Sequence, residues 1–300
     1  MELSIIICTY NREKYIPQLL ESIAREDFPY SGYEIVFVNN NSPDQTAQRC
    51  RKFQAAHPEI NFAYFEEKKQ GLSHARNRGI AEARGNILAF IDDDALAHDA
   101  YLDNMHKAFQ NRPEIFAAGG KILPLYESKR PKWMSRFLEP VMSVIDLGHK
   151  QKPFPRNKFP VGANMMFRKT VFEQVGNFNT ELGRTGKKML GGEEKDLFYR
   201  MRKADMPVFY LPDVTVSHTV PDERLTKAFI RKQALGIGES EKIRTQNFGQ
   251  GNYGTAIFKE FLKWGASLIL FVWYAAGLQY PKAAMIIKFR YWVSKGMLKN

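Results

Sequence analysis

The segment Asn86–Ala95 runs from a short apolar stretch directly into three consecutive aspartates, Asp92, Asp93 and Asp94. The apolar stretch has the length of a buried strand. Three adjacent carboxylates repel one another, and a helix N-cap uses only one of them. The pattern therefore predicts a cation at the strand end, and a divalent metal that carries a phosphorylated ligand is the natural candidate. The competing interpretation is a solvated acidic turn.

The length and composition of the chain bound its possible folds. A chain of 300 residues, 44% of them apolar, can form one large α/β domain or such a domain with an appendage. The first residues lead directly into a strand-like segment, so no N-terminal signal peptide is expected. Cys8 and Cys50 do not suggest a disulfide framework, and we expect buried thiols in a reducing cytoplasm.

Positive charge is concentrated at the C-terminus. The formal net charge is +12, and the segment from Arg224 to Asn300 contains 13 Lys and Arg against 3 Asp and Glu, which accounts for +10 of it. A basic segment of this kind is typical of nucleic-acid binding and also of contact with an anionic membrane surface.

Strands and helices alternate through the first part of the chain. Continuous apolar runs favour strands that are covered on both faces, so the alternation predicts a parallel, doubly wound α/β sheet. Gly71–Arg84 is predicted to be one of the helices, ended by Gly85 at its C′ position. The strands are expected at Leu3–Thr9, Glu34–Val38, Asn61–Phe65 and from Asn86 onward.

Polar clusters follow three of these strands, at Thr9–Arg12, Asn39–Asp44 and Asp92–Asp94. In open α/β sheets, ligands bind beyond the carboxyl ends of the strands. The coincidence of the three clusters therefore predicts a nucleotide-type site. No glycine fingerprint of the dinucleotide or P-loop type follows the first strand, so NAD and ATP are not expected.

The second part of the chain is less regular. Leu123–Pro160 is rich in proline and is interpreted either as a cover over an active site or as a plain surface insertion. Glu193–Arg202 predicts a helix that begins with acids and ends with bases, as the helix dipole favours. Further elements are expected at Asp99–Asn111 (helix), Ile115–Ile122 (strand), Val161–Arg168 (strand), Thr170–Val175 (helix), Gly176–Gly192 (glycine-rich loop), and Val208–Leu211 and Val214–Ser217 (strands before His218).

The tail beyond Leu225 has a helical pattern. Trp264–Leu278 contains no charged residue, but its 15 residues fall short of the roughly 20 that a spanning helix needs. The lysines and aromatic residues on either side favour a pair of helices at a membrane interface. The alternative is an ordinary helix docked on the main sheet.

Five motifs occur in order along the chain, at Ser4–Asn11, Asn40–Asp44, Gly71–Asn77, Phe90–Asp94 and Gly192–Leu197. Together they closely resemble those of the family-2 glycosyltransferases, which have the GT-A fold. The resemblance extends over about Leu3–Leu225, and it implies an inverting transfer of a sugar from a nucleotide-sugar with Mn²⁺ or Mg²⁺ as cofactor. A further segment, Val216–Arg224, resembles one found in members that build surface polysaccharides.

The resemblance implies roles in the donor half of the site. Asp94, as the last residue of the family's Asp-x-Asp signature, would hold the metal, and Asp92 would face the ribose and the diphosphate. Asn39 stands where many members have Asp, which leaves the base open with uridine favoured. The nucleotide-sugar site is expected to comprise Thr9, Tyr10, Asn11, Arg12, Asn39, Asn41, Arg76, Asp92 and Asp93.

Glu193 and Glu194 resemble the family's Glu-Asp pair, whose second member is usually the catalytic base. Inversion requires a carboxylate opposite the leaving group to accept the proton of the attacking hydroxyl, and Glu194 is expected to be that carboxylate. The alternative is that both glutamates only complement the helix dipole. Asp196 is expected to be a first-turn acid or an acceptor contact. His218 is expected to complete the metal site or to contact the diphosphate, with a structural role as the alternative. Arg224 is expected to pair with phosphate.

The sequence therefore predicts a GT-A glycosyltransferase domain over residues 1–224, with a nucleotide-sugar half (1–122) and an acceptor half (123–224). A basic helical tail follows over 225–300. The donor would be a nucleotide-diphosphate sugar, UDP-linked by preference, and the acceptor a glycan or lipid-linked oligosaccharide. We expect a cytoplasmic protein with peripheral contact to an anionic membrane and no nucleic-acid partner. The alternatives are a sugar nucleotidyltransferase, or a non-catalytic glycan- or nucleic-acid-binding module.

Overall fold

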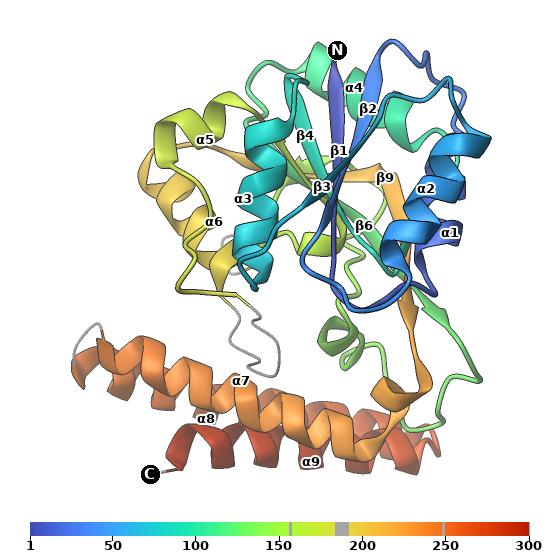
Figure 1. Cartoon of the computed structure of the whole chain (residues 1–300). Helices are drawn as coiled ribbons and strands as arrows, with labels where there is room; N and C mark the ends of the chain where they lie inside the picture. The colour runs from blue at the N-terminus through green and yellow to red at the C-terminus, as the bar shows by residue number, and fades with distance from the viewer. Residues whose placement is uncertain (156–157, 184–191, 248–249, 300) are drawn as a thin grey trace. The chain divides into compact units, whose positions relative to one another are not determined.

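A computed structural model describes residues 1–155, 158–183, 192–247 and 250–299 (Figure 1). The chain divides into two compact units. The first comprises Met1–Leu123 and Ile145–His218, and the second comprises Pro124–Val144 and Thr219–Asn300. The second unit thus combines part of the proline-rich segment Leu123–Pro160 with the C-terminal helices.

The first unit contains the alternating strands and helices that the sequence predicts. Four neighbouring strands pair in parallel, in the order β3-β2-β1-β4. This arrangement brings the carboxyl ends of β1, β2 and β4, each with its polar cluster, to one edge. The elements are β1 (Leu3–Thr9), α1 (Ile16–Ala24), β2 (Tyr33–Asn39), α2 (Thr46–Ala56), β3 (Phe62–Glu66), α3 (Leu72–Glu82) and β4 (Ile87–Asp92).

Beyond β4 the sheet also contains antiparallel pairs. It continues in the order β4-β8-β6-β9-β5, with β7 also paired to β9; β8 is antiparallel to β4 and to β6, and β5 and β7 are antiparallel to β9. The α/β class is confirmed, and the sheet combines parallel with antiparallel pairs. The two short strands expected before His218 form one long strand, β9. The elements are β5 (Ala95–Ala97), β6 (Ala117–Tyr126), β7 (Lys152–Pro153), β8 (Met165–Arg168) and β9 (Val208–Val220).

Helices cover both faces of the sheet, which explains why β1 is apolar throughout. Ile5 and Ile7 pack with α1, α2 and α4 (Tyr101–Asn111) in one core cluster. Ile6 packs on the opposite face with α3, α5 (Thr170–Val175) and α6 (Glu193–Lys203). Successive side chains of a strand point to opposite faces, so a strand covered on both sides needs apolar residues at consecutive positions.

The expectation for Gly85 is wrong. Helix α3 ends at Glu82, Ala83 is extended, and Gly85 is not among the glycines with positive φ. A Cβ on Gly85 would lie 2.7 Å from the backbone of Leu3 and Ser4. This residue is therefore glycine because the chain passes close to β1 as it enters β4.

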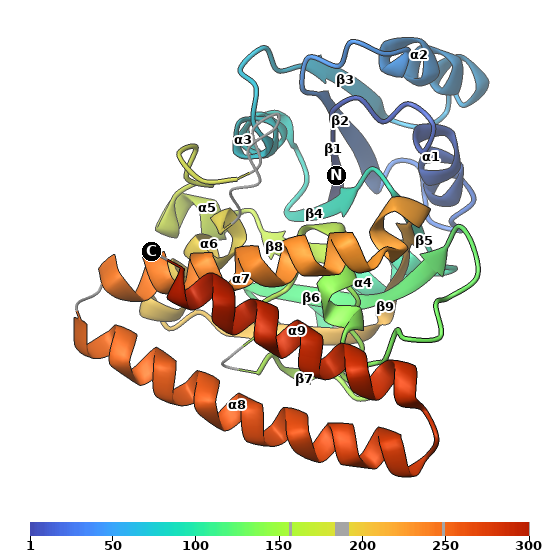
Figure 2. The ribbon, with the colours of Figure 1, turned by 90° about the horizontal axis from the view of Figure 1, so that it is seen from below.

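The second unit contains three long helices, α7 (Lys227–Asn247), α8 (Gln250–Ala276) and α9 (Tyr280–Leu298), in which α9 packs against both of the others (Figure 2). A Cβ on Gly238 would lie 2.0 Å from the carbonyl oxygen of Val293, so glycine allows α7 and α9 to approach closely. A core cluster joins Met134, Leu138 and Met142 of the proline-rich segment to Ile230 and Met285. Among the described residues, no helix is long and apolar enough to cross a membrane. Two short 3₁₀ helices, η1 (Glu139–Met142) and η3 (Asp222–Leu225), complete the unit.

Candidate active site

The three aspartates lie at the carboxyl end of β4, where a tight turn leads into β5. Thr9 at the end of β1 donates a 2.6 Å hydrogen bond to Asp93. The guanidinium of Arg12 lies 3.1 Å from Asp93 and also contacts Asp94. A cation at this strand end was predicted, and in this structure the side chain of Arg12 supplies positive charge there.

Burial raises the pKa of Asp93 to about 7, and the neighbouring Asp94 adds to the rise while Arg12 opposes it. Burial alone would lower the pKa of Arg12, but the attraction of Asp93 and Asp94 outweighs it, so the pKa of Arg12 is raised. The pocket thus holds more negative charge than one arginine compensates, which is the condition under which a divalent cation is favoured.

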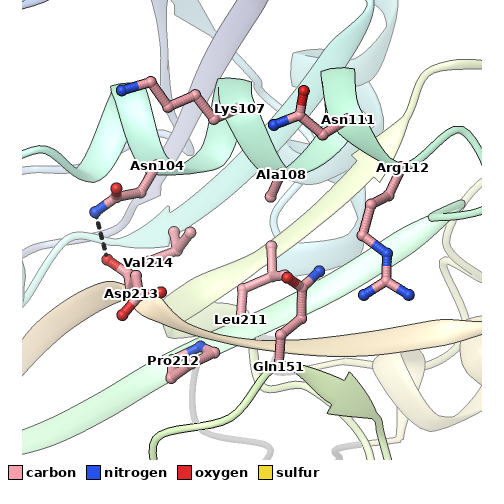
Figure 3. Close-up of a pocket in the computed structure, with 10 residues that line it drawn as sticks. All are labelled: Asn104, Lys107, Ala108, Asn111, Arg112, Gln151, Leu211, Pro212, Asp213 and Val214. Carbon is pink, nitrogen blue, oxygen red and sulfur yellow. Dashed lines mark hydrogen bonds between the residues drawn. The ribbon is translucent and has the colours of Figure 1, made fainter.

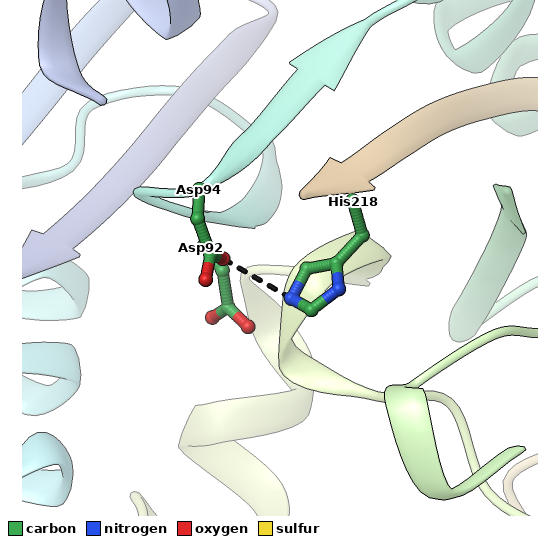
Figure 4. A group of neighbouring side chains, drawn as sticks. All are labelled: Asp92, Asp94 and His218. Atoms are coloured by element: carbon green, nitrogen blue, oxygen red, sulfur yellow. Dashed lines mark ion pairs between the residues drawn. The ribbon is translucent and has the colours of Figure 1, made fainter. Parts of the chain in front are cut away.

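His218 joins this cluster through strand pairing. The register of β5 and β9 places His218 opposite Ala95, and the His218 Nε2 lies 3.1 Å from an oxygen of Asp94. Asp92, Asp94 and His218 each present one ligand atom, and these atoms lie within 4.8 Å of one another (Figure 4). The Nδ1 of His218 is buried and has no hydrogen-bond partner among the described residues.

This donor set fits a divalent metal. Carboxylate oxygens suit Mg²⁺ and Mn²⁺, and imidazole is a common ligand of divalent transition metals. Asp94 and His218 were both expected at a metal. Asp92 was expected at the ribose and diphosphate, and its carboxylate also lies at this cluster.

Arg76 connects the acidic strand end to α6. The side chain projects from α3, is buried, and lies 3.1 Å from Glu193, 3.0 Å from Glu194 and 3.9 Å from Asp92. Sequence analysis predicts a nucleotide contact for Arg76. In this structure its guanidinium pairs with both glutamates, and it brings residues 118 positions apart into contact.

Glu194 is held by a second contact that the sequence analysis missed. The backbone N–H of Gly162, in η2 (Gly162–Asn164), donates a 2.9 Å hydrogen bond to Glu194 Oε1. A Cβ on Gly162 would lie 2.0 Å from Arg76 Nη2 and 2.6 Å from Glu194 Oε1, so a larger residue here would displace one or both of these side chains. An isolated glycine at the start of a predicted strand is the one signal that marks this position.

The two glutamates differ in their surroundings. Burial raises the pKa of Glu194, Arg76 opposes the rise, and Glu193 adds to it. Glu193 is more deeply buried, and its Oε2 has no hydrogen-bond partner in the described part of the chain. Asp196 forms an ion pair of 2.8 Å with Arg200 one turn later, in line with its expected role as a first-turn acid.

The residues expected at the nucleoside lie on two adjoining loops. Asn39 donates to the hydroxyl of Tyr64 at 2.8 Å and accepts from the N–H of Ser42 at 2.9 Å, so both ends of its amide have protein partners. The N–H of Asn11 donates to the Ser42 hydroxyl at 3.0 Å, which joins the loops. Asn11 and Asn41 have positive φ values of 55° and 59°, and Tyr10 is 42% exposed.

Arg224 and part of the glycine-rich loop are not placed at this site. Arg224 belongs to η3 in the second unit, and residues 184–191 of the glycine-rich loop lie outside the described residues. A separate recess lies between α4 and β9, where Asn104 donates to the carbonyl oxygen of Asp213 (Figure 3). None of the predicted site residues lines this recess.

The sheet, the strand-end acids and the α6 glutamates together define an enzyme of the sugar-transfer class. The family model described as glycosyl transferase family 2 matches residues 4–176, more than half of the chain. This chain therefore belongs to glycosyl transferase family 2, and it is a glycosyltransferase with the GT-A fold.

Curated relatives and solved structures agree with this assignment. A glucosyl-dolichyl phosphate glucuronosyltransferase from Haloferax volcanii is 23% identical over 249 residues, which cover 81% of this chain and 77% of the relative. Glycosyltransferase AglE from the same organism is 29% identical over 60% of this chain, which spans only 56% of that relative. The fold is similar to that of the mannosyltransferase PcManGT from Pyrobaculum calidifontis, solved with GDP-Man and Mn²⁺, with a TM-score of 0.63, 19% identity, and coverage of 100% of this chain and 88% of that one.

Proposed function

We propose that this glycosyltransferase moves a sugar, with inversion, from a nucleoside-diphosphate sugar to a hydroxyl group of a glycan or lipid-linked oligosaccharide. The observation that carries the proposal is the position of Arg76. It lies within 3.9 Å of Asp92 on the strand-end cluster and 3.0 Å from Glu194 on α6. Asp92, on the donor side, and Glu194, the candidate base, therefore both lie beside the buried guanidinium of Arg76.

Glu194 is the proposed general base. Its carboxylate accepts the proton of the acceptor hydroxyl while the hydroxyl oxygen bonds to the sugar carbon and the bond from that carbon to the diphosphate breaks. The base must be ionised, and the ion pair with Arg76 favours the ionised form. Arg76 and the N–H of Gly162 also restrict the carboxylate to one orientation.

The proposed metal ligands are Asp94 and His218, with Asp92 beside them, and the proposed ion is Mn²⁺ or Mg²⁺. When bound, the metal neutralises the charge that develops on the departing diphosphate. Thr9 at the end of β1 supports this cluster through its hydrogen bond to Asp93. Arg12 contacts Asp94 in this structure, and it is proposed to pair with the diphosphate when a metal is bound to Asp94 instead. Tyr10, Asn11, Asn39 and Asn41 are proposed to line the nucleoside pocket.

The acceptor proposal draws on relatives. The Haloferax relative is named for transfer to glucosyl-dolichyl phosphate, and a relative in Rhizobium meliloti is named as a succinoglycan biosynthesis protein. We propose for this chain a lipid-linked or glycan acceptor in envelope polysaccharide synthesis, used at the cytoplasmic face of a membrane. A UDP-sugar is our first expectation for the donor.

The test combines ligand binding with turnover. A bound ligand raises apparent stability by mass action, so thermal shifts measured with UDP-sugars and GDP-sugars, each with and without Mn²⁺, identify the base and the metal requirement. Glu194→Gln and Asp94→Ala should abolish sugar-nucleotide turnover. Asp196→Asn, which removes a charge from the same helix start, should leave most of it. Unchanged turnover in both of the first two variants would reject the proposal.

A further inference from the structure

The helix α8 presents a large apolar face to the outside. Six apolar side chains on it are between 53% and 71% exposed. Their positions in the chain follow the period of the helix, and they therefore lie on one side of it. We call this set the α8 apolar face; it consists of Phe258, Phe261, Leu262, Leu268, Ile269 and Val272.

Two polar side chains of α8 face the opposite way. Glu260 and Ser267 are only 6% and 5% exposed. Arg290 of α9 lies 3.1 Å from Glu260, and the hydroxyl of Ser294 donates to Glu260 at 3.0 Å. A helix in contact with water normally buries its apolar side, whereas this part of α8 buries polar side chains and exposes apolar ones. In a lipid environment, polar groups must be hydrogen-bonded inside the protein, and the surface that meets the lipid must be apolar.

The charges beside this face identify the surface that it suits. Lys259 and Lys263 are exposed on α8, and Lys282, Lys288 and Lys295 follow on α9, whereas Glu260 is the one acid in the described parts of the two helices. A second copy of this chain would bring two equally basic surfaces together. Nucleic acid would leave the leucine, isoleucine and valine side chains without an apolar partner. An anionic bilayer satisfies both the charge and the apolar area.

We propose that the α8 apolar face docks on an anionic lipid bilayer, with α8 lying in the plane of the membrane at the boundary between headgroups and acyl chains. Trp273 and Tyr280, 59% and 60% exposed, are placed to enter the headgroup layer. The inference deepens the proposed function, because a lipid-linked acceptor presents its sugar at such a surface. Docking itself does not require the proposed chemistry.

The test is flotation of the full chain with vesicles. Wild-type protein should float with vesicles of phosphatidylcholine and phosphatidylglycerol, and much less with phosphatidylcholine alone. Phe261→Asp with Ile269→Asp should weaken binding on the order of a hundredfold, because both side chains would leave the acyl region. Lys259→Glu with Lys288→Glu should weaken it on the order of tenfold, and only for anionic vesicles.

Matched controls separate the outcomes. Ile243→Asp on α7 replaces an equally exposed apolar side chain, 58% exposed, outside the α8 apolar face and should float like wild type. Equal loss in this control, or no flotation of the wild-type chain, would overturn the proposal. So would a dimer in sedimentation that the Phe261→Asp and Ile269→Asp variant converts to a monomer.

The failure of docking and the failure of the proposed chemistry are distinguishable. The Phe261→Asp and Ile269→Asp variant should keep the thermal shift given by nucleotide-sugar and Mn²⁺, because its changes lie on the surface of α8. Glu194→Gln should lose turnover and still float. A wild-type chain that floats but turns over no sugar-nucleotide would reject the proposed function and leave the docking surface in place.

Discussion

Arg76 and Glu194 are joined by an ion pair of 3.0 Å, although they are 118 residues apart and belong to α3 and α6. Glu193 lies 3.1 Å from the same guanidinium. One buried arginine thus balances two carboxylates, one of which is the proposed base. Removing one partner of a buried pair leaves an uncompensated charge, which costs more than the pair itself contributes.

Arg76→Met should destabilise the protein by about 3–5 kcal/mol, because Glu193 and Glu194 would be left without their cation. The control is Arg78→Met on the same helix, where a 40% exposed side chain pairs with Glu82 at 2.8 Å. We expect that change to cost about 0–1 kcal/mol. Urea unfolding followed by circular dichroism measures both, and equal costs would contradict the assigned importance of Arg76.

Turnover should fall on the acid side with the titration of Glu194. Burial raises the pKa of this carboxyl, so the acid limb of kcat/KM should lie above the usual range of a glutamate. Arg76→Gln should move the limb further up, because Arg76 opposes the rise. Asp196→Asn should leave it in place. A limb at the ordinary glutamate pKa would argue against Glu194 as the base.

The raised pKa of Glu194 also makes the stability of the fold depend on pH. The folded state binds the Glu194 proton more tightly than the unfolded chain does, because the folded pKa is raised. Its contribution to stability is therefore complete below the unfolded pKa and is lost as pH rises through the folded pKa. Glu194→Gln should flatten this part of the curve of unfolding free energy against pH.

Arg12→Ala should increase the response to Mn²⁺ alone. The Arg12 guanidinium contacts Asp93 and Asp94 in this structure, so it competes with a metal for the same carboxylates. The variant should melt at a lower temperature without metal and gain more from Mn²⁺ than the wild type, as measured by thermal shift. Asp94→Ala should remove the gain. An unchanged or smaller gain in Arg12→Ala would show that Arg12 and the metal do not compete.

Gly162→Ala should cost about 1–3 kcal/mol and reduce turnover, because the new Cβ would lie 2.0 Å from Arg76 Nη2 and force it away from Glu194. Gly236→Ala on α7 is the matched control, since a Cβ there meets no atom within 4 Å. Alanine in a helix should stabilise that variant by about 0.5–1 kcal/mol. Chemical unfolding and turnover assays compare the two, and a tolerated Gly162→Ala would remove the positioning role of this glycine.

Much of the first unit follows from local sequence. The continuous apolar runs at β1, β2 and β4 predict strands buried on both faces, because consecutive side chains of a strand alternate between the faces. Asp92–Asp94 marks a strand end that needs a cation, and ordered motifs indicate the family. The antiparallel pairing of β8 with β4 and with β6 was not predicted, because pairing partners beyond a hairpin leave no local pattern.

The amino-acid sequence by itself determined the set of chemical groups: the three aspartates, the two glutamates, His218, and a basic tail that contains the uncharged segment Trp264–Leu278. What only the tertiary structure decided was which of them meet. The register of β5 and β9 brings His218 to Asp94, and Arg76 reaches Glu194 beside a glycine that no motif marked. The outward direction of the α8 apolar face likewise depends on the ion pair between Glu260 and Arg290 of α9. Composition and spacing encode the groups and their local periodicity, whereas contacts between distant residues depend on packing of the whole chain.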